Sequence, residues 1–396
     1  MIEAAATTFA SILVLGGGFA IAGYVYHISY KALVLEKMRN AFEPGDPVLE
    51  LAALGKQRPR ELVRVHDPDN PDDPAADHWI VRDEQGRIDD IVAGRDVGHY
   101  HLLIGEKGTG KSSMLIEAMR KVDGQGVAMF EAHADLEIVR IRLGKALDFE
   151  FHEDYIGGYF SERGPRDSTA LLDIERALNK LEKVALRHRV RHAGRPLVLI
   201  INQMHLIRDD DDGKDLIELL QQRAEQWAAS ALVTMIFNSD DYWVWERLKQ
   251  LATRMEVHPI TDLPKPEAIA ALRRYRTRYI DKLGSTTMQQ QQQQQQQDHD
   301  RRRGDRCRND DDAVYEKVYE RVGGRLSFLN RVSKADDMLA TCERIIETEK
   351  RWFLNNCWIL GSEMDDDVMD QQKWAVRVAV LLVTLISDLP RFGSCS

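Results

Sequence analysis

Residues 102–112 read LLIGEKGTGKS, and this stretch decides the fold. Leu102–Ile104 are apolar and end a short buried strand, and a helix with one apolar face is expected from residue 113 to 122. Between the two, Gly105–Ser112 fits the pattern G-x-x-x-x-G-K-[ST]. Its glycines let successive backbone N–H groups point at phosphate oxygens, and the following helix adds a partial positive charge at its first turn. The pattern therefore predicts a site for a nucleoside triphosphate.

Individual residues of this loop have expected roles. Lys111 reaches the β- and γ-phosphates, and the Ser112 hydroxyl binds Mg²⁺. No N-K-x-D guanine signature follows the loop, which favours ATP over GTP. The expected cofactors are ATP and Mg²⁺, and the residues expected to hold them are Gly105, Glu106, Lys107, Gly108, Thr109, Gly110, Lys111, Ser112 and Ser113.

A second buried strand, Leu197–Ile201, ends in amides where such sites normally carry acids. An aspartate there orients Mg²⁺ and its waters, and a glutamate activates the attacking water. Asn202 and Gln203 have the same shapes but no charge, and Gln203 cannot accept a proton as a base. The pair predicts slow hydrolysis, or ATP binding without turnover. Glu131 and the Asp209–Asp212 run are substitute acids, although a solvated loop is the favoured interpretation of the aspartates.

Polar and basic residues after the next strand are further candidates. Leu232–Phe237 ends in Asn238, Ser239 and Asp240, and a polar residue there is a candidate for touching the γ-phosphate or a water. The alternative is that Asn238 only caps or turns the chain. Arg247 and Arg254 come next, and one of them is a candidate for contacting a neighbouring subunit's nucleotide. Arg325 follows two glycines at the start of a later helix and is a candidate for reaching the nucleotide from a second domain.

Alternating strands and helices between residues 79 and 262 predict an α/β fold, a P-loop parallel sheet in a three-layer αβα arrangement. An all-helical lid is expected at 263–335, with helices at Glu267–Tyr279, Val314–Val322 and Leu326–Lys350. A run of nine glutamines, Gln289–Gln297, lies within a stretch, 285–312, expected to be a disordered insert. Residues 336–396 form a helical carboxyl-terminal segment.

The amino-terminal residues are more apolar than those of a typical soluble protein. Residues 7–27 carry no charge, and 21 helical residues span about 31 Å, enough to cross a bilayer. Lys31, Lys37 and Arg39 follow, which by the positive-inside rule keeps the rest of the chain on the cytoplasm-like side. A buried soluble helix or an unusual leader is the alternative. We therefore expect a transmembrane anchor with its flank at 1–40 and a linker at 41–78, rich in proline and acidic residues.

Composition limits the remaining classes of function. The net charge of −10 argues against a general nucleic-acid binder. The four cysteines have no C-x-x-C spacing and predict neither a zinc site nor a redox pair. His99, His101 and His133 show no metal-ligand spacing, so core or surface roles are favoured for them.

Together, the ordered motifs between about Trp79 and Ala335 resemble those of the AAA+ ATPases. The resemblance implies that Asn238 is sensor 1, that Arg247 or Arg254 is the arginine finger, and that Arg325 is sensor 2. It also implies a helix at Trp79–Gly94 beside the base. The stretches GHYHLLIGEKGTGKSS, FEAHADLEI, LIINQMHLI and CWILGSEMDDDVMDQQKW are similar to fungal membrane-anchored AAA+-like proteins with a carboxyl-terminal winged helix. That likeness implies a mitochondrial inner membrane setting facing the matrix, and a winged helix starting after about Lys350 that this chain does not complete.

The leading functional hypothesis is an ATP-dependent, membrane-anchored switch, with Lys111, Asn202, Gln203, Asn238, Arg254 and Arg325 at its catalytic positions. Its expected partners are the nucleotide, the membrane through residues 7–27 and, if an arginine serves a neighbour, further copies of the chain. Two alternatives remain: an active AAA+ motor or chaperone, and a scaffold or nucleic-acid-binding protein that uses the winged helix.

Overall fold

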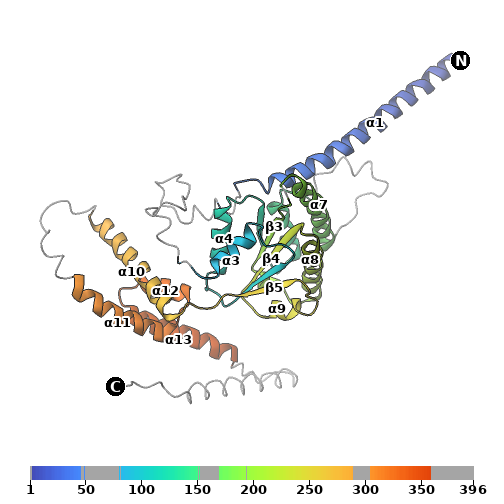
Figure 1. Cartoon of the computed structure of the whole chain (residues 1–396). Coiled ribbons are helices and arrows are strands. Elements are labelled where there is room, and N and C mark those ends of the chain that lie inside the picture. Colours follow the sequence, from blue (N-terminus) through green and yellow to red (C-terminus); the bar gives the residue numbers. More distant parts are fainter. Residues whose placement is uncertain are drawn as a thin grey trace, which may run out of the picture. The chain divides into compact units, whose positions relative to one another are not determined.

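The computed structural model describes residues 2–45, 82–149, 169–192, 194–288 and 304–357, together with the single residues 49, 80 and 151 (Figure 1). The chain divides into two compact units, residues 1–261 and 262–396. Each unit is built around its own set of elements and is described by itself.

The first unit is centred on a sheet of five parallel strands in the order β2-β3-β4-β1-β5. The strands are β1 (Tyr100–Ile104), β2 (Val127–Glu131), β3 (Leu197–Asn202), β4 (Val233–Ser239) and β5 (Met255–Pro259). Every residue of β1, β3 and β4 is buried, as the continuous apolar runs of these strands require when helices cover both faces. Because all strands run the same way, their carboxyl ends meet at one edge of the sheet.

Helices cover both faces of this sheet (Figure 1). On one face, α3 (Gln85–Val92) and α4 (Lys111–Lys121) pack through Ile88, Ile91 and Met114 against alternate strand residues such as Leu103 and Ile236. The other face carries α5 (Leu136–Ala146), α7 (Ala170–Arg191), α8 (Asp211–Ser230) and α9 (Trp243–Leu248). The predicted three-layer α/β class is confirmed. Helix α3 is shorter than the expected Trp79–Gly94 helix, and α5 and α9 were not anticipated.

Helix α1 (Ile2–Asn40) has two different parts. Its segment from Phe9 onward is long and apolar enough to cross a membrane, and Phe9, Leu15 and Phe19 are exposed. A signal sequence near an amino terminus has the same properties. The last turns differ, because Val34, Met38 and the following Phe42 are buried, and Met38 and Phe42 belong to the core on the α7 side of the sheet. The end of α1 is thus part of the first unit's packing.

The second unit is helical, as expected for the region after the sheet. Its elements are α10 (Lys265–Met288), α11 (Gly304–Val322), α12 (Leu326–Ser333) and α13 (Met338–Cys357). The single helix expected over Leu326–Lys350 is wrong, because the chain breaks at 334–337 into α12 and α13. Asp337 accepts a hydrogen bond from the Ala340 backbone N–H at 2.9 Å and so starts a new helix there.

The expected disordered insert at 285–312 is too long, since α10 continues to Met288 and α11 begins at Gly304 rather than near Val314. Once a helix is nucleated, each further residue adds a hydrogen bond, so its charged ends extend beyond the apolar pattern that signals it. The glutamine run, most of the predicted linker 41–78 and the tail after Cys357 lie outside the described residues. The expected winged helix lies almost entirely in that tail.

Candidate nucleotide site

The phosphate-binding loop connects β1 to α4 at the carboxyl edge of the sheet. Gly110 has φ of 101°, a left-handed conformation that glycine adopts without steric cost, and it leads directly into α4. A Cβ atom on Gly105 would lie 2.1 Å from the Ile260 carbonyl oxygen, so only glycine fits there. The loop thus has the tight, backbone-lined form that presents N–H groups to phosphate.

Lys111 lies in the centre of this loop and is almost completely buried. Its ammonium donates to the carbonyl oxygens of Gly105 at 2.7 Å and Glu106 at 2.9 Å. It also forms an ion pair with Asp240, with 2.8 Å between Nζ and Oδ1. Thr109 closes the loop from within, its hydroxyl donating to the Glu106 carbonyl at 3.0 Å. Glu106, Lys107 and Ser113 are exposed at the surface of the same loop.

Ser112, Asn202 and Asn238 form one hydrogen-bonded network that joins α4, β3 and β4. The Ser112 hydroxyl donates to Asn202 Oδ1 at 3.0 Å, and Asn238 Nδ2 donates to Ser112 Oγ at 3.0 Å and to Asn202 Oδ1 at 2.5 Å. Both asparagines are about 97% buried or more. Asn238 Oδ1 is buried and lacks a hydrogen-bond partner among the described residues, so the network ends in an unused acceptor.

Gln203 and His205 follow β3 at the same edge. Gln203 has φ of 59° and begins the short helix η2 (Met204–Leu206). His205 Nδ1 accepts a hydrogen bond from the Asp240 backbone N–H at 3.1 Å, and its Nε2 lies 3.8 Å from Asp240 Oδ2. Because Nδ1 accepts, the ring proton lies on Nε2, facing the carboxylate. Asp240 is therefore contacted by Lys111 on one oxygen and by His205 on the other.

Arg82 ties the loop to the end of the first unit. Its buried guanidinium donates to the Thr109 carbonyl at 2.8 Å and to the Thr261 carbonyl at 2.6 Å. Thr261 is the last residue of the first unit. One charged side chain thus holds both the phosphate-binding loop and the strand exit that leads into the second unit.

The substitute acids considered from the sequence, Glu131 and the Asp209–Asp212 run, have other partners. Glu131 ends β2, three strand positions from β1, about 14 Å at normal strand spacing. Its side chain is 52% exposed and lies 3.9 Å from Arg142. In the Asp209–Asp212 run, Asp210 caps α8 through the Gly213 N–H at 2.8 Å, and Asp209 and Asp211 are largely exposed beside Lys214. The run therefore starts a helix.

The three candidate arginines lie at different places. Arg254 precedes β5, and its carbonyl accepts a hydrogen bond from Tyr100 at the start of β1, about 13 Å from the loop at the other end of that strand. Arg247 is half-buried on α9. Arg325 belongs to the second unit, where it precedes α12 and lies 3.5 Å from Asp262. Arg254 is thus too far from its own chain's loop to serve it.

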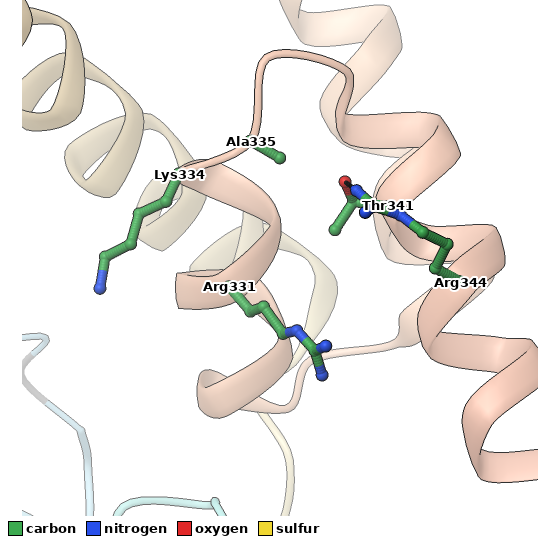
Figure 2. Close-up of a pocket in the computed structure, with 5 residues that line it drawn as sticks. All are labelled: Arg331, Lys334, Ala335, Thr341 and Arg344. Carbon is green, nitrogen blue, oxygen red and sulfur yellow. Dashed lines mark hydrogen bonds between the residues drawn. The ribbon is translucent and has the colours of Figure 1, made fainter.

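A basic pocket of about 210 Å³ is found in the second unit (Figure 2). It lies between α12 and α13 and is lined by Arg331, Lys334, Ala335, Thr341 and Arg344. Arg344 donates to the Thr341 hydroxyl at 2.8 Å. Its arginine and lysine side chains are exposed, so the pocket is a solvated basic surface.

Sequence reasoning missed His205 and Arg82 at this site. No sequence pattern links Arg82 to residues 27 and 179 positions away. The structure brings together Lys111, Ser112, Asn202 and Asn238, and it places Asp240, one of the polar residues expected after β4, against Lys111. His205 joins Asp240 from the end of β3.

The comparisons with known proteins agree with this geometry. Residues 78–236 match the AAA ATPase domain, and residues 355–391 match the fungal AAA protein C-terminal winged helix domain. Among solved structures, a Walker-type ATPase of Pyrococcus abyssi is similar, with a TM-score of 0.44 and 12% identity over 70% of this chain and 74% of that one. No curated protein matches the chain. The chain therefore contains an AAA ATPase domain, in which the phosphate-binding loop lies at the edge of the parallel sheet, followed by a segment that matches the winged helix domain of fungal AAA proteins.

Proposed function

We propose that this protein is a membrane-anchored ATP-binding switch that hydrolyses ATP slowly or not at all. The observation that carries the proposal is the hydrogen bond between Ser112 and Asn202, which puts a neutral amide beside the expected magnesium-binding hydroxyl, where such sites carry an aspartate. The residues present can bind ATP and Mg²⁺, but the expected general base, which would take a proton from water, is replaced by an amide.

The residues present fit a Mg²⁺-bound nucleoside triphosphate. Gly105 and Gly110 give the loop its phosphate-cradling backbone, and Lys111 supplies the buried positive charge. Ser112 offers one hydroxyl oxygen to the metal. The unused Asn238 Oδ1 adds a buried acceptor that can bind a metal-coordinated water or a polarised donor. When bound, Mg²⁺ neutralises phosphate charge, and these side chains orient it.

Hydrolysis requires a group that takes a proton from water. Gln203 stands where that group is expected, and an amide has no proton affinity useful at neutral pH. The neutral Asn202 also binds a metal-coordinated water less strongly than a carboxylate does. General bases contribute about 10²- to 10⁴-fold to rates, so their loss leaves a site that binds ATP but turns it over slowly.

A working ATPase is the second candidate function, and the position of Asp240 supports it. Among the described residues, its carboxylate makes the only ion pair with Lys111, and His205 holds its second oxygen. In an active enzyme, Asp240 is the acid that replaces the missing glutamate. In a switch, the same carboxylate competes with the phosphates for Lys111 and weakens ATP binding.

The Asp240→Asn substitution separates these two roles. In a switch, removal of the competing charge tightens ATP binding by about tenfold and changes turnover little. In an enzyme, the same substitution abolishes turnover. Isothermal titration with a non-hydrolysable ATP analogue measures the first effect, and phosphate release measures the second. Asp241→Asn is the matched control, because Asp241 is exposed and makes no ion pair among the described residues.

Anchoring and assembly complete the proposal. The uncharged residues 7–27 of α1 cross the membrane, and the basic residues Lys31, Lys37 and Arg39 keep the ATP-binding unit on the cytoplasm-like side, which we assign to the mitochondrial matrix. Arg254 is exposed at the opposite sheet edge from its own loop. In this proposal Arg254 acts on the nucleotide of a neighbouring copy, in a homo-oligomer.

The deciding experiment uses the full chain in detergent, because the buried Met38 and Phe42 make the end of α1 part of the first unit. Mg²⁺-dependent ATP binding and phosphate release are measured together, with Lys111→Ala as the control that removes the buried charge. Tight binding that Lys111→Ala abolishes, with turnover below about one per hour, supports the switch. Equal ATP binding by Lys111→Ala contradicts the proposed site, and rapid turnover that depends on Asp240 favours the enzyme.

A further inference from the structure

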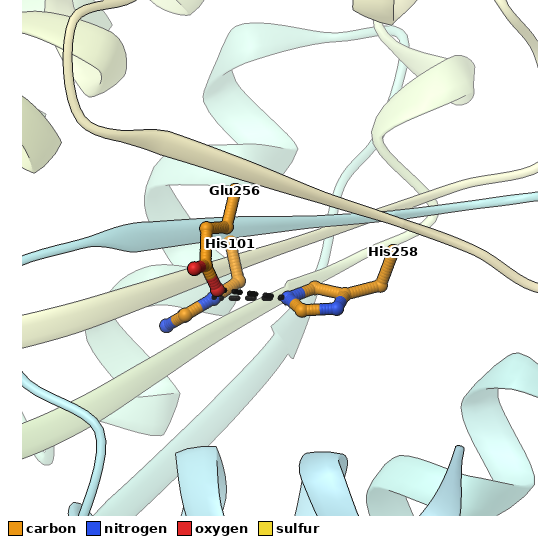
Figure 3. A group of neighbouring side chains, drawn as sticks. All are labelled: His101, Glu256 and His258. Atoms are coloured by element: carbon orange, nitrogen blue, oxygen red, sulfur yellow. Dashed lines mark hydrogen bonds and ion pairs between the residues drawn. The ribbon is translucent and has the colours of Figure 1, made fainter. Parts of the chain in front are cut away.

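A second cluster of polar side chains lies on β1 and β5, the last two strands of the sheet on the side away from Asn202. His101 on β1 pairs in register with Glu256 on β5, and Leu103 pairs with His258, so the two β5 side chains lie beside His101 (Figure 3). His101 is completely buried, and the side chains of His258 and Glu256 are 17% and 37% exposed. The cluster is therefore a half-enclosed site on the edge strand.

Three ligand atoms in this cluster face one another. His101 Nδ1 lies 3.1 Å from His258 Nε2 and 3.5 Å from Glu256 Oε2, and the last two atoms are 3.6 Å apart. Two ligands bound tetrahedrally at 2.0–2.1 Å from one zinc ion are about 3.3 Å apart. The three separations bracket that value, so a single ion can contact all three atoms with small side-chain adjustments.

We infer that His101, His258 and Glu256 form a binding site for one divalent metal ion of the zinc type. The two imidazoles are borderline nitrogen ligands and the carboxylate is a hard oxygen ligand, and a set dominated by imidazole suits Zn²⁺ better than the hard ions Mg²⁺ and Ca²⁺. Three protein ligands leave a fourth position for water, as in accessible rather than fully closed zinc sites. The inference is independent of the proposed nucleotide switch.

The surroundings of His101 support this site. Its other ring nitrogen, Nε2, is buried without a hydrogen-bond partner in the described part of the chain, and it lies 3.9 Å from Asp96 Oδ2. In metal sites a ligating histidine commonly directs its second nitrogen at a carboxylate, which orients the ring. A hydrogen bond between His101 and His258 would explain the position of His101 Nδ1. It would not explain why His101 Nε2 is directed at Asp96.

The charge of the cluster is also compatible with a cation. Glu256 and Asp96 carry two negative charges, and Arg87 pairs with both carboxylates at 2.8 and 2.5 Å. The cluster thus has a net negative charge before a metal binds.

A bound ion would join β1 to the edge strand β5. The first of these strands leads into the phosphate-binding loop, and the second leads through Ile260 and Thr261 to the end of the first unit. Since Ile260 packs directly on Gly105, a metal clamp between the strands stabilises the base of the loop. We expect this stabilisation to appear as a higher unfolding temperature.

The test uses the full chain in detergent, purified without a histidine tag and stripped with a chelator. Zn²⁺ is titrated in competition with a chromophoric chelator, and Co²⁺ is used as a spectroscopic substitute. His258→Gln and Glu256→Gln preserve side-chain size but remove ligands, and circular dichroism checks their folding. His133→Gln is the matched control, because His133 is partly exposed beyond β2 and bonds only to the local Asp135 N–H among the described residues.

We expect one zinc equivalent whose affinity falls at least tenfold in both cluster variants and is unchanged in His133→Gln. The native protein should show visible Co²⁺ absorption bands and a zinc-dependent rise in unfolding temperature, and both cluster variants should lose these signals. Because cysteine thiols elsewhere in the chain also bind zinc, the test is the difference in zinc affinity between the native protein and the cluster variants. Equal zinc affinity and equal Co²⁺ spectra in native protein and both cluster variants would overturn the inference, and Glu256→Gln alone decides if His258→Gln does not fold.

Discussion

At the scale of single residues, the chemistry of the site depends on the difference between an acid and its amide. Asn202 and Gln203 occupy the end of β3 with the shape of aspartate and glutamate. The φ of 59° at Gln203 belongs to the backbone, and glutamate adopts it at the same cost. Restoring the acids therefore changes charge with little change in geometry.

We expect the double substitution Asn202→Asp with Gln203→Glu to raise ATP turnover by at least about 100-fold, because it returns a general base and a charged metal partner. Phosphate release under saturating Mg²⁺ and ATP measures it. Lys111→Ala in the same background is the control and should return the rate to baseline. An unchanged rate in a protein that still binds ATP would mean that the amides do not limit hydrolysis.

At the scale of elements, two contacts join segments that are distant in sequence. Arg82 connects the phosphate-binding loop to Thr261, and the end of α1 joins the core beside α7. Neither contact is part of a helix or a strand ladder.

Arg82→Ala is expected to lower the free energy of unfolding by about 2–4 kcal/mol, because it removes two hydrogen bonds from a buried charged donor. ATP affinity should fall as well, since the Thr109 carbonyl loses its anchor. Urea unfolding and ATP titration measure the two effects. Arg95→Ala provides the control: Arg95 is 63% exposed and pairs with Asp90, so it should change stability by less than about 0.5 kcal/mol. Equal losses of stability in Arg82→Ala and Arg95→Ala would contradict the proposed role of Arg82 in holding the phosphate-binding loop.

Met38→Ala tests the packing of α1. Met38 is fully buried against the first unit, and emptying such a position costs about 2–5 kcal/mol. Leu33, on the same helix, is 53% exposed, so Leu33→Ala should have a much smaller effect. Urea unfolding followed by tryptophan fluorescence compares them. Similar midpoints for native protein and Met38→Ala would show that this part of α1 does not support the ATP-binding unit.

At the scale of the whole molecule, α1 combines an apolar segment long enough to cross a membrane and a core segment in one continuous helix. No loop separates the exposed apolar residues near Phe19 from the buried Met38. A helix of 39 residues is about 58 Å long, which leaves roughly half of it beyond a bilayer core. The proposed anchor would therefore hold the ATP-binding unit near the membrane surface.

We expect the protein to remain with membranes after alkaline carbonate extraction, because the uncharged segment spans the bilayer. Leu15→Arg with Phe19→Arg should release it, since two charges at the bilayer centre are costly. Leu33→Arg is the control outside the span. Release of the native protein by carbonate would exclude a spanning anchor, and cleavage of residues 1–27 from the mature protein would identify a leader instead.

Local sequence determined a large part of this protein. The phosphate-binding loop, the buried strands and the amide pair at 202–203 are visible because each is a short pattern whose conformation depends on neighbouring residues. Helix ends were less predictable, as the break at Asp337 and the early start of α11 at Gly304 show. Capping bonds and cooperative extension set those positions, and neither follows the apolar pattern.

Tertiary structure alone decided which distant side chains share a site. Sheet order places Asp240 against Lys111, 129 positions away in sequence, and sets Glu131 three strands from the loop. The pairing of β1 with β5 brings His101 to His258, although neither has ligand spacing along the chain. Strand order and register depend on how all the helices cover the sheet, so contacts between separate strands cannot be deduced from any short segment. The sequence alone determined a P-loop ATP-binding fold. Packing decided that Asp240 lies against Lys111, and that His101 and His258 lie side by side on neighbouring strands.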